Sequence, residues 1–120
     1  MTPEIAAVRA ASLEFAALLG VVHVHQAPAS AAPPYAVVSV TTSEDVLAQG
    51  VRIGTMVRLR IDVLASETVH PASRPASWSR AVPGWTVDAV PVGAQAEAYE
   101  EGGRPWRRTV LEYSATVRPA

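Results

Sequence analysis

The chain has 120 residues, contains no cysteine and carries a formal net charge of −1 at pH 7. This length fits one domain, 1–120, that needs no structural metal or disulfide, and the lack of cysteine excludes disulfides, thiolate metal sites and cysteine nucleophiles. A net charge near zero argues against a protein that binds nucleic acid by neutralising phosphates. No apolar run approaches the roughly 20 residues of a membrane span, so we expect no membrane partner.

The first predicted element is a helix that ends at Gly20. Thr2 supplies a capping hydroxyl, Pro3 suits the first helical position, and Glu4 places an acid in the first turn. Apolar residues then recur at intervals of three and four, which predicts one face packed on the rest of the domain. This predicted face comprises Ile5, Val8, Ser12, Phe15 and Leu19, with Leu18 beside it.

Two β-branched runs follow the helix, and we expect strands over residues 21–25 and 35–42. Residues 26–34 between them contain three prolines, which lack the amide donors of a strand ladder and predict a loop. Residues 43–50 are polar and are expected to form a loop or a long hairpin connection.

The clearest strand prediction spans residues 56–64. Apolar residues alternate there with Arg58, Arg60 and Asp62, so one face is apolar and the other is charged. A solvent-facing sheet has this pattern, and a polar subunit contact or the wall of a lumen has it too.

Prolines interrupt residues 66–84, which we expect to form an irregular link in which 75–80 could make one helical turn. Strand-like alternation resumes at 85–92, and a glycine-rich connection then joins strands 94–100 and 106–118 in a closing hairpin. The sequence therefore predicts an α+β fold. An N-terminal helix packs on a mostly antiparallel or mixed sheet of about five strands, with the proline-rich link at 66–84 and a C-terminal β-hairpin.

No group of residues has the spacing of a catalytic or cofactor site. His23 and His25 lie two residues apart on a predicted strand, so both imidazoles could approach one metal ion, with His70 or a distant carboxylate as third ligand. Exposed histidines on an edge strand are the simpler interpretation. We therefore expect no enzymatic activity, no cofactor and no metal.

The three tryptophans, Trp78, Trp85 and Trp106, lie near predicted loops or strand beginnings. They could close the ends of a small core. Alternatively, one or two of them could anchor a protein interface, where tryptophan is enriched.

Three stretches, in this order, resemble the tail-terminator proteins of long-tailed (siphovirus-like) bacteriophages. The first is the N-terminal helix ending at Gly20, with the strand and proline-bearing loop that follow it. The second is the apolar run 34–40, which leads through a polar gap to the alternating strand 57–63. The third is 99–117, where an acidic, glycine-containing turn precedes a strand that starts at Trp106.

The resemblance implies a structural virion protein, assembled in the host cytoplasm and located at the head–tail junction. It would form a hexameric ring on the last ring of the tail tube, stop tube growth and offer a docking face to the head connector. Its partners would be further copies of itself, the tail-tube protein and the connector protein. It would bind no specific nucleic-acid sequence, although the ring could line the DNA channel.

One departure from the family leaves a neighbouring class open. Tail terminators usually place a substantial helix between the alternating strand and the closing hairpin, where this chain has the proline-broken residues 66–84. A tail-tube subunit or a head–tail connector (stopper) subunit is therefore an alternative. A small metal- or ligand-binding domain that uses His23 and His25 is a third one.

Ring closure by a heterologous contact requires complementary patches on opposite sides of one subunit. Rows of arginine and carboxylate could supply part of this complementarity and fix the register. Loops 26–34 and 43–53 are the expected contacts to neighbouring rings. The expected subunit-interface residues are Arg58, Arg60 and Asp62, with Arg107, Arg108 and Glu112 as second choice.

Overall fold

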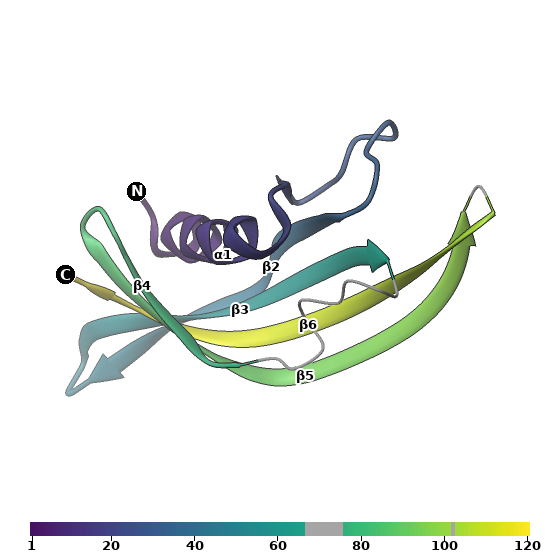
Figure 1. The fold of residues 1–120 in the computed structure, drawn as a ribbon. Coiled ribbons are helices and arrows are strands. Elements are labelled where there is room, and N and C mark those ends of the chain that lie inside the picture. Colours follow the sequence, from purple (N-terminus) through teal and green to yellow (C-terminus); the bar gives the residue numbers. More distant parts are fainter. Residues whose placement is uncertain (67–75, 102) are drawn as a thin grey trace.

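The computed structural model describes residues 1–66, 76–101 and 103–120. These residues form one helix, α1, and six strands. The elements are α1 (Pro3–Leu19), β1 (Val22–Val24), β2 (Tyr35–Ala48), β3 (Val51–Ser66), β4 (Trp78–Val82), β5 (Trp85–Glu101) and β6 (Arg104–Pro119). Figure 1 shows α1 lying on one side of a sheet with the strand order β1-β2-β3-β6-β5-β4. The α+β class is confirmed, and the sheet contains six strands where about five were expected.

The sheet is built from two long hairpins that lie side by side. Strand β1 pairs with β2 in parallel, and the other neighbouring strands are antiparallel. Because Thr55 pairs with Val117 and Ser66 with Trp106, the β2–β3 and β5–β6 turns lie at opposite ends of the sheet. The molecule is correspondingly elongated, with principal extents of 57 × 23 × 20 Å (Figure 1).

The helix begins and ends where the sequence predicts. The Thr2 hydroxyl accepts a hydrogen bond from the Ile5 amide at 3.2 Å, as an N-cap residue does. Gly20 has φ of 84° and donates its amide to the Ala16 carbonyl at 2.8 Å. The positive φ is unfavourable for other residues and explains why glycine ends the helix.

The face that α1 turns to the sheet matches the predicted one in part, since Phe15 is buried and Val8 and Leu19 pack against the core. Ile5 and Leu18, which were expected on the buried side, are 55% and 52% exposed. Alanine has no side chain beyond Cβ, so it lets the helix approach the sheet closely and loses no side-chain entropy on burial. The spacing of the large apolar residues therefore predicted part of this face and left out its alanines. The residues that α1 buries are Pro3, Ala6, Ala7, Ala10, Ala11 and Phe15.

The helix-side face of the central strands forms the hydrophobic core. In β3 the residues Val57, Leu59, Ile61 and Val63 are fully buried and alternate with charged ones, which confirms the predicted alternation over 56–64. The neighbouring strand β6 contributes its own alternating set, which comprises Thr109, Leu111, Tyr113, Ala115 and Val117. Trp78 and Trp85 are half-buried and pack against this core, as expected of residues that close its ends.

The polar segment 43–50, expected to be a loop or a long hairpin connection, forms the end of a hairpin, with strand at 43–48 and its turn at 49–50. Strand β2 continues to Ala48, and a two-residue turn at Gln49 and Gly50, with φ of 52° and 78°, leads into β3. Two positive φ values are typical of the tight turns that match the twist of a hairpin. Both faces of the strand are exposed in this segment, so its side chains lack the apolar alternation that predicts a strand.

The expected irregular link 66–84 also contains a strand. Residues 78–82 form β4 and pair with β5, and residues 76–77 are not helical, so the predicted helical turn over 75–80 is wrong for 76–80. Residues 67–75 lie outside the described part of the chain. The two strands expected over 85–92 and 94–100 are one strand, β5, with a register shift between Pro91 and Gly93. Long-range pairing with β6 holds β5 together across this irregularity.

Candidate functional site

The sheet face opposite α1 carries a row of charged side chains. On β3, Arg58, Arg60 and Asp62 alternate with the buried core residues and therefore point away from the helix. On β6, Arg108 and Glu112 lie on the same face, and Glu112 pairs in register with Arg60. We call these five residues the charged face.

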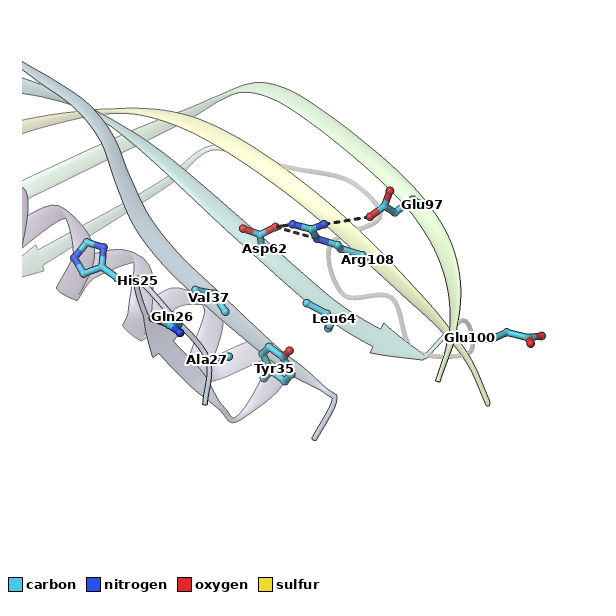
Figure 2. A pocket seen from close by; sticks show the side chains of 10 residues that line it. All are labelled: His25, Gln26, Ala27, Tyr35, Val37, Asp62, Leu64, Glu97, Glu100 and Arg108. Atoms are coloured by element: carbon cyan, nitrogen blue, oxygen red, sulfur yellow. Dashed lines mark hydrogen bonds and ion pairs between the residues drawn. The ribbon is translucent and has the colours of Figure 1, made fainter. Parts of the chain in front are cut away.

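Asp62 is the centre of an ion-pair network on the charged face. It accepts hydrogen bonds from Arg60 Nε at 3.1 Å and from Arg108 Nη2 at 2.7 Å. Arg108 also reaches Glu97 on β5, with 3.3 Å between Nη1 and Oε1. Figure 2 shows Asp62, Arg108 and Glu97 linked across three strands. The hydrogen bond to Asp62 raises the pKa of Arg108 above its ordinary value.

Strand register explains why these particular residues meet. Arg60 and Asp62 lie two apart on β3 and so share a face. Arg108 pairs with Leu64, which places it diagonally from Asp62 at a distance that a long side chain spans. Glu97 lies directly opposite Arg108 on β5. The network therefore depends on β3, β6 and β5 being neighbours, although β5 and β6 are distant from β3 in sequence.

The structure brings five of the six expected interface residues to one face. Arg58 and Glu112 are 3.9 Å apart and both largely exposed, so their pair contributes little to stability. Arg107 lies on the other face, because it pairs with Ala65, which is buried on the helix side. The odd–even alternation of β6 separates Arg107 from Arg108.

A hollow of about 640 Å³ lies beside this network. It is lined by Asp62, Arg108, Glu97, Tyr35 and His25, among others, and Figure 2 shows these residues around it. Both carboxylate oxygens of Asp62 accept hydrogen bonds from arginines. Use of Asp62 as a base or metal ligand would therefore require these ion pairs to break.

The two histidines do not form the arrangement that a shared metal site would require. The His23 ring packs edge-on against Tyr35, with 5.5 Å between centroids. His25 follows β1 and has φ of 66°, so strand alternation does not extend to it. Within residues 1–66, 76–101 and 103–120, no three His, Asp or Glu side chains are grouped closely enough to hold a metal ion. His70 lies outside these ranges.

Comparison with known proteins gives no relative for this fold or sequence. No family model, curated protein or solved structure matches the chain. In the part of the chain that the structure describes, no helix combines the length and apolar character needed to cross a bilayer.

A projecting two-stranded arm forms much of the segment 43–53, which the sequence analysis expects to contact neighbouring rings. Residues 46–54, at the tip of the β2–β3 hairpin, extend past the point where β6 pairs with β3. Leu47, Val51 and Ile53 on this arm are 62%, 64% and 52% exposed. The apolar residues on both sides of Gln49 and Gly50 were its signal in the sequence. Loop 26–34 lies at the other end of the molecule (Figure 1).

An apolar groove between α1 and the outer edge of β2 is a feature that the sequence prediction missed. It encloses about 510 Å³, and Ile5, Val8, Val24 and Val40 form much of its wall. Glu4, Arg9, Ser12 and His25 complete its lining. Ile5, Val8 and Ser12 were predicted to face the core. All three line this α1–β2 groove, and Val8 also packs against the core.

Proposed function

We propose that this chain is a non-enzymatic structural subunit that closes into a ring, and that it acts as a tail terminator of a long-tailed bacteriophage. In this role it caps the tail tube and joins it to the head connector. The charged face is the observation that supports this proposal best. Its arginines and carboxylates form ion pairs with one another within β3 and across strands, and no cluster of three metal-ligating side chains is present in the described residues.

Arginine suits such a contact because its planar fork keeps further donors after one ion pair has formed. Arg60 and Arg58 are partly exposed beside their carboxylate partners, so they can also engage carboxylates of a neighbouring copy. Ion pairs between copies fix the register of a contact more than they add to its affinity. A ring needs this property, because every copy must adopt the same rotation.

The strand edges of the sheet offer a second source of contact between copies. Within the described residues, β1 covers β2 only at 36–38, and β4 covers β5 only at 85–89. Unpaired stretches of β2 and β5 thus lie on opposite sides of one subunit. Different patches on opposite sides are what a heterologous, ring-closing interface requires.

Light scattering coupled to size-exclusion chromatography tests this proposal. The protein is measured alone and with tail tubes, and we expect hexamers or a monomer that becomes a hexamer on tube ends. A protein that stays monomeric and ignores tube ends contradicts the proposal. Growth into long tubes would favour the tube-subunit alternative, and a single ring that binds the portal side would favour the connector.

Charge reversal tests the role of the charged face directly. Arg58→Glu should weaken assembly, and raising the ionic strength should weaken assembly of the unmodified protein in the same direction. Arg107→Glu makes the same charge change on the opposite face and is the matched control. Equal loss of assembly in both variants would show that the charged face has no special role.

A further inference from the structure

We infer that the arm of one copy occupies the α1–β2 groove of the next copy. This inference rests on the proposed function, because it names the contact by which the copies would join. Both surfaces belong to the same chain, and their shapes and chemistry are complementary. One projects and the other is hollow, and apolar side chains dominate both.

We expect a partner to stabilise the arm. It is a two-stranded ribbon that extends past the end of the main sheet. An isolated two-stranded hairpin is only marginally stable in water. Three of its aliphatic side chains are more than half exposed. A monomeric soluble protein rarely leaves such residues grouped on a projection. Burying them on another copy removes apolar surface from water, which is favourable.

The groove offers two kinds of contact to an arriving arm. Ile5 and Val24 present apolar surface at its walls, and Val40 lies at its base on β2. Among the described residues, the outer edge of β2 has no strand beside it from Val40 to Ala48, whereas its inner edge pairs with β3. A strand of the arm can therefore extend the sheet along this edge while its aliphatic side chains fill the groove, as in other cases of strand addition.

The arm cannot reach the groove of its own chain. The Ser43 hydroxyl donates to Glu4 at 2.9 Å, which fixes the base of the arm beside the first turn of α1. The groove runs from Glu4 towards Val24, whereas the arm continues in the other direction. Leu47 lies four strand residues beyond Ser43, roughly 13 Å further out. The contact must therefore join two copies, and it is heterologous.

Charges at the two surfaces are compatible with this contact. The arm carries Arg52, which is 3.6 Å from Asp45 and half exposed. The rim of the groove carries Glu4 and Arg9, and within the described residues Arg9 makes no ion pair. The groove rim and the arm together with the adjoining Asp45 thus each present one acid and one base, so opposite charges can face each other across the contact.

Disulfide trapping tests the inference cleanly, because the chain has no cysteine of its own. Two single-cysteine variants, Leu47→Cys and Ile5→Cys, are given tags of different size, mixed and oxidised gently. A disulfide requires Cα atoms within about 7 Å. We expect a mixed dimer to form about a hundredfold faster than by random collision, because an arm held in the groove gives a millimolar effective concentration.

The matched control pairs Leu47→Cys with Val90→Cys. Val90 lies on β5, away from the groove, and is 54% exposed against 55% for Ile5. Preferential cross-linking of Leu47→Cys with Ile5→Cys supports the inference, and equal rates for the two pairs overturn it. A Leu47→Asp variant, with circular dichroism to verify the fold, should lose the cross-link between Ile5→Cys and a second-site Val51→Cys.

The outcomes separate this inference from the proposed function. A closed ring without preferential cross-linking at Ile5 overturns the arm-in-groove contact and leaves the ring proposal standing. Preferential cross-linking in open chains or filaments supports the contact and contradicts the closed ring. Light scattering of the cross-linked samples distinguishes these cases.

Discussion

The Phe15 ring on α1 contacts the Tyr113 ring on β6 edge to face, with 6.2 Å between centroids and 69° between planes. Trp78 on β4 packs on the same tyrosine at 5.9 Å. Three elements that are distant in sequence therefore meet on Tyr113. Of the described residues, Phe15 is the one large side chain that α1 buries fully, so we expect this contact to help anchor the helix.

Replacing Phe15 by alanine should lower the free energy of unfolding by about 3–5 kcal/mol, since it removes buried ring surface and leaves a cavity. Urea denaturation followed by circular dichroism measures this change. Leu13→Ala on the exposed side of α1 is the control and should stay within about 0.5 kcal/mol of the unmodified protein. A loss below about 1 kcal/mol for Phe15→Ala would mean that the ring contact does not anchor the helix.

Alkaline pH should destabilise the protein through Tyr113. Burial raises the pKa of this phenol above the ordinary value of about 10. A group with a raised folded pKa contributes stability that is complete below its unfolded pKa and is lost as pH rises through the folded pKa. The free energy of unfolding should therefore fall above about pH 10, as measured by urea denaturation at several pH values.

The lack of lysine makes this pH dependence easier to assign to tyrosine. All ten basic residues are arginine, which stays protonated far above pH 10, so tyrosines dominate the titration in this range. In Tyr113→Phe the alkaline decrease should be smaller, because only the other two tyrosines remain. If the free energy of unfolding of this variant fell as steeply with pH as that of the unmodified protein, groups other than Tyr113 would be responsible.

Substitution by alanine should affect stability differently at Gly54 and at Gly93. A Cβ at Gly54 would lie 3.1 Å from the Val117 carbonyl oxygen and 3.2 Å from Arg118 Cγ, so the strands would have to move apart. We expect Gly54→Ala to lower stability by about 1–3 kcal/mol. At Gly93 the nearest atom is 4.0 Å away, and alanine should be neutral or stabilising by about 0.4–1 kcal/mol. Thermal denaturation of both variants gives the comparison, and similar effects would contradict the strand spacing.

Asp62→Asn should cost about 1 kcal/mol, because two arginines lose a charged acceptor while solvent screens part of the effect. Glu97→Gln removes a charge at the more exposed end of the same network and should change stability by less than about 0.5 kcal/mol. Urea denaturation at low and high salt measures both, and the effect of Asp62→Asn should shrink at high salt. Equal losses of stability in the two variants would contradict the central position of Asp62 in the network.

Features that depend on neighbours in sequence could be predicted from the sequence. The Thr2 cap and the Gly20 end of α1 are local hydrogen-bonding and φ requirements, and the structure has both. The alternation over 56–64 identified the buried and the charged faces of β3 because strand geometry alternates regardless of context. The same alternation in β6 separates Arg107 from Arg108, so the sequence alone was sufficient to exclude Arg107 from the charged face.

Features that depend on distant partners required the tertiary structure. The close approach of α1 to the sheet selects alanines for burial and leaves Ile5 at the α1–β2 groove, and no periodicity of large residues reveals this choice. Pairing with β5 makes residues 78–82 a strand despite the prolines around them. The Asp62–Arg108–Glu97 network forms because β6 lies between β3 and β5, and this order results from long-range strand pairing that short sequence patterns do not encode.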